Sequence, residues 1–412
     1  MSFIKDLGKR STQEKKFTSG EMRLIAIECL QWCAMTAVYY LGLIGIATYD
    51  LGGDAFLVAA VTLAHNLMTS IGNAVSGPVI DRIGPRRTTL GSLALSMVAS
   101  LVMWIIPINV ASVMFAAVFL GLTGGFINTC THTFPAYLVD TPDRRQRLNG
   151  HLVLYGNVAF MIGPIIGGVL MGYFPTKVVY LLLSVCMGMA FAVALQCHEV
   201  FVPERGKGVG RSHVASGMVD GARIVFHDRK LRVVFLSGFL GFFAFGAFDS
   251  LESLYYRDVL RVDIAWLGYL SAVVGLTSAI GSYMLTKMPT ERLSIRLLLQ
   301  SLFLVGVGSI VYVATDQLWV AIVGQLINGF AWGYLEPLQM ILTQENTPLT
   351  HVGRVTGFVR FGLMSAGVVP LLAAPFLSSV LGVQPVLLGA SCVVALVGMA
   401  FLMNWRDDPE HS

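Results

Sequence analysis

The sequence predicts an all-α protein that crosses a membrane twelve times, as two halves of six helices. Of its 412 residues, 55% are hydrophobic and only 13% are charged, and the mean hydropathy is +0.71. A soluble domain carries about 25% charged residues, so much of this surface must face lipid. Twelve apolar runs each reach about 20 residues, the length that spans the hydrocarbon core of a bilayer.

The apolar runs follow one another with mostly short loops after a polar N-terminal tail. We expect the spans at 23–48, 55–80, 88–107, 109–137, 149–174, 178–200, 231–256, 264–287, 293–314, 317–343, 354–379 and 383–404. Glycine is frequent inside them, and in lipid small residues let neighbouring helices approach closely. The tail lacks the order of charged, apolar and small residues that marks a cleaved signal peptide, so the first span is expected to direct its own insertion.

One long connection divides the spans into six and six. It runs from Val202 to Lys230, is rich in glycine and basic residues, and contains a candidate amphipathic helix at 214–227. We therefore expect an N-terminal tail, a first half, a linker, a second half and a C-terminal tail at 1–22, 23–200, 201–230, 231–404 and 405–412.

Lysine and arginine collect on one side of the spans. The N-terminal tail and the loops after even-numbered spans hold most of them, whereas the opposite loops hold little beyond Lys177, Arg257 and Arg261. Basic loops stay on the cytoplasmic side, so both termini are expected in the cytoplasm and the chain in the cytoplasmic membrane. Because the positive charge is spread over loops and forms no single patch, no nucleic-acid partner is expected.

No motif points to catalysis, a cofactor or a metal site. The phosphate-binding pattern G-x-x-x-x-G-K-S/T is absent, so ATP is not the expected energy source, and H-E-x-x-H and G-x-S-x-G are absent too. The six cysteines form no C-x-x-C pair and are expected to be buried free thiols. They are Cys29, Cys33, Cys130, Cys186, Cys197 and Cys392. We expect a monomer that is not an enzyme; a membrane-embedded enzyme and a sensor unable to transport are the alternatives.

The loop between the second and third spans carries the most specific motif. It reads Gly77-Pro-Val-Ile-Asp81-Arg82-Ile-Gly84-Pro-Arg86-Arg87. Its carboxylate can meet a helix N-terminus, and its arginines can pair with acids at helix ends. The motif resembles the signature loop G-x-x-x-D-R-x-G-R-K/R of the major facilitator superfamily, with a proline interrupting the basic run. The resemblance extends over essentially the whole chain.

That resemblance implies a secondary transporter whose small-molecule site lies between two six-helix halves that rock to give alternating access. In the family the signature loop latches the halves on the cytoplasmic side. Here Asp81 is expected to face the start of the eleventh span, and Arg82 or Arg86 to meet Asp140 below the fourth span.

The fifth span contains Gly163-Pro164-Ile-Ile-Gly167-Gly168. A proline in a membrane helix frees a carbonyl and permits a bend, and flanking glycines allow close helix crossing. The run is similar to the glycine-proline motif of drug:proton antiporters in the family, although the upstream glycine of the full motif is replaced around Ala159. The fourth span also lacks the arginine that many proton-coupled members carry.

Four acidic residues inside the apolar spans are candidates for function, because an ionised carboxylate there costs about 2.5–3.5 kcal/mol on insertion. Asp249 and Glu252 share one face of the seventh span, and their repulsion favours a proton on one of them. Glu336 lies in the tenth span beside a proline, and Glu28 lies near the cytoplasmic end of the first span, where it snorkels, pairs with Arg23 or joins the other acids. The resemblance places these spans around the central cavity, so the four acids are candidates for proton coupling and cation binding.

Polar and aromatic side chains accompany these acids. They are Tyr39 on the first span, His65 and Asn66 on the second, Trp332 on the tenth and Arg360 on the eleventh. Aromatic faces attract cations, and Arg360 is either a charge partner of an acid or a substrate contact. For each residue the alternative is a helix–helix hydrogen bond or packing against lipid.

The leading hypothesis is multidrug efflux: protons entering from outside displace an amphipathic, often cationic, small molecule from the carboxylates. The segment from Phe245 through Asp249, Glu252 and Tyr255-Tyr256-Arg257-Asp258, together with Leu267-Gly268 in the next span, is similar to the corresponding segments of macrolide-efflux-like and siderophore-exporter-like members of the family. The alternative keeps the fold and changes the task to uptake of a metabolite, or to transport of a lipid or siderophore-like molecule.

Overall fold

The computed structural model describes residues 17–139, 141–198, 211–347 and 351–405. Within them every regular element is a helix, and twelve segments are long and apolar enough to cross a membrane. The predicted all-α architecture with twelve spans is therefore confirmed. The contacts divide the chain into two compact units, Met1–Ile46 with Leu63–Glu204 and Ala47–Thr62 with Arg205–Ser412.

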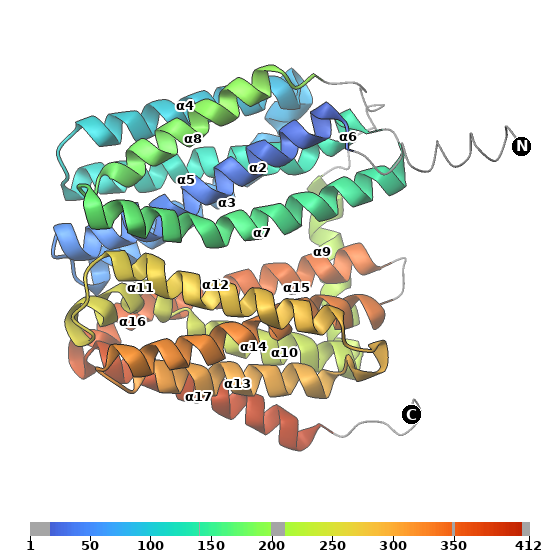
Figure 1. Ribbon diagram of the computed structural model, residues 1–412. Coiled ribbons are helices and arrows are strands. Elements are labelled where there is room, and N and C mark those ends of the chain that lie inside the picture. Colours follow the sequence, from blue (N-terminus) through green and yellow to red (C-terminus); the bar gives the residue numbers. More distant parts are fainter. Residues whose placement is uncertain (1–16, 140, 199–210, 348–350, 406–412) are drawn as a thin grey trace, which may run out of the picture. The chain divides into compact units, whose positions relative to one another are not determined.

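The first unit contains α2 and the helices up to α8 (Figure 1). In order they are α2 (Ser19–Ala37), the π-helix η1 (Val38–Asp50), α3 (Ala55–Ile83), α4 (Pro85–Ile105), α5 (Val110–Thr133), α6 (Pro135–Leu138), α7 (Pro142–Tyr173) and α8 (Val178–Leu195). The end of η1 and the beginning of α3 belong by contact to the second unit. Within the first unit α2 packs on α7 and α8, and α4 packs on α5 and α8.

Glycines bring the helices of the first unit into close contact. A Cβ atom on Gly163 of α7 would collide with the carbonyl oxygen of Cys33 on α2, and one on Gly167 would lie 2.5 Å from a methyl group of Leu41. Pro164 and Gly168 are buried in the same stretch of α7. The glycine-proline run therefore brings α7 close to the first span, as its composition predicts.

The second unit contains the helices from α9 to α17. In order they are α9 (Arg211–His227), α10 (Arg229–Phe245), α11 (Phe248–Leu254), the π-helix η2 (Tyr255–Val259), α12 (Ala265–Thr286), the 3-10 helix η3 (Thr290–Arg292), α13 (Ile295–Val313), α14 (Leu318–Glu345), α15 (Val352–Ala366), α16 (Val368–Leu381) and α17 (Val383–Asn404). Leu298, Leu299 and Val305 of α13 form a buried apolar core with Leu338 of α14 and Val394 of α17.

Helix α14 is held on two sides by contacts that leave no room for a Cβ atom. A Cβ on Gly324 would lie 2.5 Å from the Cα atom of Tyr312 on α13, and one on Gly329 would lie 2.5 Å from the carbonyl oxygen of Val274 on α12. Gly333 approaches the Ser278 carbonyl of α12 in the same way. Close backbone approach increases the dispersion contacts between helices, so α12, α14 and α13 form one tightly packed group.

Two predicted helices are interrupted in the structure. The expected continuous helices at 231–256 and 354–379 break at Gly246, between α10 and α11, and at Gly367, between α15 and α16. The two breaks meet, because a Cβ on Gly246 would lie 2.6 Å from the Cα of Gly367. Glycine is tolerated at this crossing because it has no Cβ, and it is also a weak helix former.

Several helix ends differ from their predicted positions. Helix α2 begins at Ser19, four residues before the predicted 23, because Thr18 and Glu21 form a reciprocal capping box. Helix α8 ends at Leu195 instead of 200. The amphipathic helix of the linker, expected at 214–227, spans Arg211–His227.

The segment Ala47–Thr62 makes specific contacts within the second unit. The hydroxyl of Thr48 donates a hydrogen bond to the Ser253 hydroxyl at 2.7 Å. Arg257 donates to the carbonyl oxygens of Thr48 and Gly53 at 2.5 and 2.8 Å. The predicted halves at 23–200 and 231–404 remain a prediction, since this division by contact assigns Ala47–Thr62 differently.

Candidate functional site

Glu252 is held by donors from three elements of the second unit. Its Oε1 atom accepts hydrogen bonds from the hydroxyls of Tyr312 on α13 at 2.8 Å and Tyr256 on η2 at 3.2 Å. The amide of Gln325 on α14 donates to the same oxygen at 3.4 Å. A half-buried carboxylate in an apolar span needs such donors to offset its desolvation, and here it has them.

Asp249 lies one turn before Glu252 on α11 and has a different environment. Its side chain is exposed, and among the described residues it makes no hydrogen bond or ion pair. Glu336 on α14 is also exposed and likewise has no such partner in the described part of the chain. The predicted acids of the second unit thus divide into one held carboxylate and two open ones.

A row of aromatic rings runs beside these acids. The Trp332 ring centroid lies 5.2 Å from that of Phe242 and 5.5 Å from that of Phe245, both edge-on. Phe245 stacks on Phe248 at 5.1 Å, and Phe248 stacks on Tyr312 at 6.4 Å. The row therefore connects the predicted Trp332 with a donor to Glu252. Aromatic faces beside open carboxylates can bind an organic cation by combined charge and cation–π attraction.

Glu28 is buried in the first unit, with only 1% of its surface exposed. Its Oε1 accepts a hydrogen bond from the Trp32 indole nitrogen at 2.8 Å, whereas its Oε2 and the Oε1 of buried Gln31 have no hydrogen-bond partner. Arg23 donates to the carbonyl oxygen of Gln196 instead. Glu28 therefore does not snorkel, and its hydrogen bond is to Trp32, not to Arg23.

The structure brings together three other predicted residues of the first unit. The rings of Tyr39 and His65 lie 4.9 Å apart, and His65 Nδ1 lies 3.4 Å from Asn66 Oδ1.

Arg360 is exposed on α15 of the second unit, and the described residues offer it no ion pair or hydrogen bond. Its predicted role as a charge partner or substrate contact stays a prediction.

The two glycines of the signature loop have different environments. Gly84 caps the N-terminus of α4 with φ +88°, a left-handed conformation that strongly favours glycine. Gly77 lies within α3, and a Cβ atom there would meet nothing within 4 Å. Packing therefore does not explain Gly77.

The charged residues of the signature loop are described only in part. Arg86 donates a hydrogen bond to the carbonyl oxygen of Leu195 at 2.7 Å, and Arg82 is exposed. Asp140 and the surroundings of the Asp81 side chain lie outside the described residues. The predicted latch is therefore untested.

Sequence reasoning missed one buried ion pair. Arg144 of α7 donates through Nε and Nη2 to the two carboxylate oxygens of Glu21, each at 2.8 Å. Glu21 is fully buried, and it also completes the capping box with Thr18. The Thr-x-x-Glu spacing just before an apolar run was the available signal.

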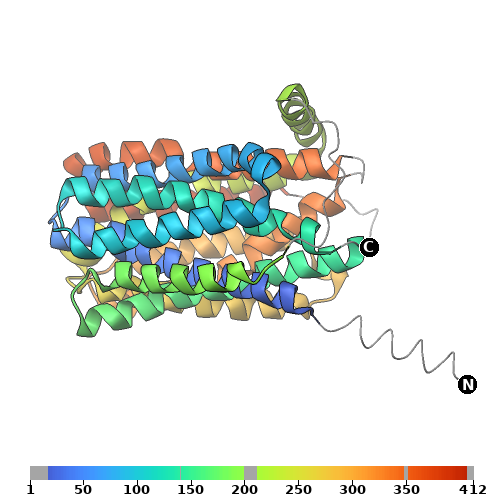
Figure 2. The same cartoon turned by 90° about the horizontal axis from the view of Figure 1, so that it is seen from above.

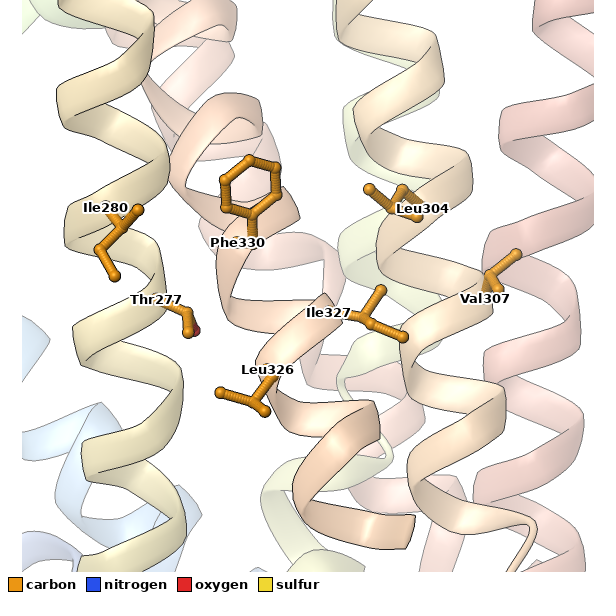
Figure 3. A pocket seen from close by; sticks show the side chains of 7 residues that line it. All are labelled: Thr277, Ile280, Leu304, Val307, Leu326, Ile327 and Phe330. Atoms are coloured by element: carbon orange, nitrogen blue, oxygen red, sulfur yellow. The ribbon is translucent and has the colours of Figure 1, made fainter.

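A pocket in the second unit has none of the predicted acids in its lining (Figure 3). It has a volume of about 420 Å³ and is lined by residues of α12, α13 and α14: Thr277, Ile280, Leu304, Val307, Leu326, Ile327 and Phe330. The Thr277 hydroxyl is hydrogen-bonded within its own helix, so the lining is apolar. No cluster of three His, Cys, Asp or Glu side chains in the described residues could hold a metal ion.

Known proteins resemble this chain over most of its length. The multidrug efflux pump Tap of Mycolicibacterium fortuitum is 25% identical over 374 residues, which cover 86% of this chain and 89% of that protein. The multidrug resistance protein MdtG of Escherichia fergusonii is 23% identical over 342 residues, covering 80% and 79%. The crystal structure of the nucleoside transporter NupG matches with a TM-score of 0.68 at 10% identity, covering 94% and 99%, and so supports the fold alone.

The family model described as Major Facilitator Superfamily matches residues 27–370. This range includes most of the first span, the second to tenth spans, the signature loop and all four candidate acids. With twelve apolar helices among the described residues and a family match of this extent, the chain is a multi-pass membrane transporter that belongs to the Major Facilitator Superfamily.

Proposed function

We propose that this transporter exports amphipathic, often cationic, small molecules in exchange for protons, by alternating access. Relatives named as a multidrug efflux pump and a multidrug resistance protein support export of varied compounds. The observation that carries the proposal is Glu252, a carboxylate inside an apolar span that three donors hold beside the open carboxylate of Asp249. We place the protein in the cytoplasmic membrane as a monomer, surrounded by lipid and with both termini in the cytoplasm.

The three acids of the second unit have separate tasks in this proposal. Asp249 and Glu336 are exposed and attract the cation, while Trp332 offers an aromatic face. Glu252 takes up the proton. Protonation removes negative charge beside the substrate and weakens its binding, so proton entry and substrate release are linked. Each charge that crosses 100 mV contributes about 2.3 kcal/mol, which is sufficient to drive such a cycle.

Glu28 is a second proton site in the proposal. The buried Oε2 of Glu28 and the buried Oε1 of Gln31 both lack a donor, and the two residues lie one turn apart on α2. A buried acceptor without a donor is costly. One proton on Glu28 would supply a donor between them.

The remaining predicted residues complete the cycle. We assign Tyr39, His65, Asn66 and Arg360 to the polar lining that the substrate meets. Movement between states is assigned to the signature loop with Asp140, and to the close crossing of α7 with α2. These residues are Gly77, Asp81, Arg82, Gly84, Arg86, Asp140, Gly163, Pro164, Gly167 and Gly168.

The test is dye transport into inverted membrane vesicles with an imposed proton gradient. We expect Glu252→Gln to abolish gradient-dependent accumulation of a cationic dye, because an amide cannot exchange a proton. Asp249→Asn and Glu336→Gln should raise the KM for the cation about tenfold each, the factor that corresponds to about 1.4 kcal/mol, with a smaller effect for a neutral lipophilic compound. Glu291→Gln is the matched control, since Glu291 is an exposed acid of η3 outside the site.

Two outcomes would contradict the proposal. Gradient-dependent transport by Glu252→Gln at the native rate would exclude Glu252 as the proton site. Failure of the correctly inserted native chain to move any cationic dye would favour transport of a metabolite, lipid or siderophore-like molecule.

A further inference from the structure

Helix α9 differs in direction from the other long helices of the second unit. It runs across their axes in Figure 1 and again in Figure 2, where it is the short yellow-green helix at the top. Only Asp228 separates it from α10, whose N-terminus Asp228 caps by accepting a hydrogen bond from the Leu231 backbone at 2.8 Å. Since α10 begins the membrane span Arg229–Val259, α9 ends at the level where a span begins.

One face of α9 is fixed to its own unit. Val225 is fully buried and packs with Leu231 and Phe235 of α10 and with Val355 and Val359 of α15. The helix is therefore an ordered part of the second unit and carries a defined outer face.

That outer face is apolar at two positions seven residues apart. Val219 is 62% exposed and Phe226 is 46% exposed, and this spacing puts them on the same side of a helix. The Phe226 ring also packs edge-on against Phe235 of α10 and Phe358 of α15, so Val219 is the more open of the two. The other large exposed apolar side chains of the described residues lie inside the candidate spans or close to the end of one. By contrast, Val219 lies ten residues before the span Arg229–Val259 and Phe226 three residues before it.

Basic residues surround the same face. Arg223 lies between the two apolar residues and is exposed, and α10 begins with Arg229, Lys230 and Arg232. The two acids of the described linker, Asp220 and Asp228, offset only part of this charge. Arg223 lies before the span Arg229–Val259, and the other three basic residues lie in its first turn. A basic group at the end of a membrane span is the arrangement that binds anionic lipid headgroups.

We propose that α9 lies on the bilayer surface, with Val219 and Phe226 inserted at the headgroup level and the basic cluster bound to anionic phospholipid. An amphipathic helix with this pattern of apolar and basic residues binds the membrane interface in its plane. The inference rests on the membrane embedding of the chain and not on the proposed substrate or coupling ion. Failure of the dye experiment would therefore leave it intact.

The test is hydrogen–deuterium exchange of residues 219–227 in the full chain, reconstituted into lipid nanodiscs. Discs of phosphatidylcholine are compared with discs that contain phosphatidylglycerol in addition. A basic residue at an anionic surface contributes a factor of roughly five to binding, so we expect exchange to slow by at least that factor when phosphatidylglycerol is present. The triple variant Arg223→Gln, Lys230→Gln, Arg232→Gln should lose this lipid dependence.

Two further variants separate surface binding from folding. Val219→Ser should speed exchange in both kinds of disc while leaving the melting temperature of the chain unchanged, because Val219 is on the outer face, whereas Phe226 also packs on Phe235 and Phe358. Arg292→Gln, an exposed basic residue of η3, should behave as the native chain. Equal exchange in both lipids, or exchange that Val219→Ser does not alter, would overturn the proposal.

Discussion

Asp249 and Glu252 lie on one short helix but have different environments, because residues of other helices donate hydrogen bonds to Glu252. The sequence predicts the pair and its shared face, and the structure places both on α11. Their environments differ because Tyr312 and Gln325 reach Glu252 from 60 and 73 residues away along the chain. Polar residues inside apolar spans were visible in the sequence, but which acid they contact depends on helix packing that no local pattern encodes.

The buried ion pair of the first unit leads to a stability prediction. Removing one partner of a buried pair costs about 3–5 kcal/mol. We expect Glu21→Gln to destabilise the protein by roughly 3 kcal/mol, because the Arg144 guanidinium loses its charged partner and α2 loses an acidic capping residue. Thermal unfolding in detergent measures the change.

The matched control for that prediction is Asp258→Asn. The Arg257–Asp258 pair is more exposed than the Glu21–Arg144 pair, and exposed pairs contribute about 0–1 kcal/mol. Equal destabilisation by both variants would show that burial of the Glu21 carboxylate does not determine how much stability the protein loses with the ion pair.

At the scale of helices, sequence patterns located the spans but not their interruptions. Hydropathy gave twelve segments within a few residues of their observed positions, because length and apolarity are local properties. The breaks at Gly246 and Gly367 were missed because they depend on a contact between the two glycines. Each looked the same as the many glycines that only ease helix packing.

The crossing of α7 and α2 offers an internally controlled test. Gly163→Ala would place a methyl group against the backbone of Cys33 and the hydroxyl of Thr36, and overpacking of this kind costs about 1–3 kcal/mol. We expect a lower melting temperature and reduced transport. Gly150→Ala lies in the same helix with nothing within 4 Å of its new Cβ, so it should leave both unchanged. A Gly163→Ala variant with unchanged melting temperature and transport would show that α7 and α2 can move apart without loss of stability.

For the whole molecule, the sequence predicted two six-helix halves, but one segment crosses that division. Ala47–Thr62 belongs to the first half by its position in the chain and to the second unit by its contacts. Counting six spans in each half could not predict that Ala47–Thr62 packs with the second unit. The contacts responsible join groups about 200 residues apart in the sequence.

If the halves move against each other during transport, these contacts must break in one part of the cycle. Thr48→Cys with Ser253→Cys replaces two hydroxyls that lie 2.7 Å apart and should form a disulfide on mild oxidation. We expect efflux to fall at least tenfold, the factor that corresponds to about 1.4 kcal/mol, and to recover with a reductant. Each single variant, which retains the native cysteines, is the control. Full efflux in the cross-linked chain would show that this contact persists throughout the cycle.

The glycine contacts of α14 have a consequence for how the proposed proton site, Glu252, can respond to movement of a helix. Helix α14 packs closely on α12 and α13. Tyr312 of α13 and Gln325 of α14 therefore belong to one tightly packed group of helices, which keeps their two donor groups close together. Glu252 is attached to a different piece, α11, which the break at Gly246 separates from α10. A small displacement of α11 would move the Glu252 carboxylate away from these two donors. The proton affinity of Glu252 would then change with the position of α11.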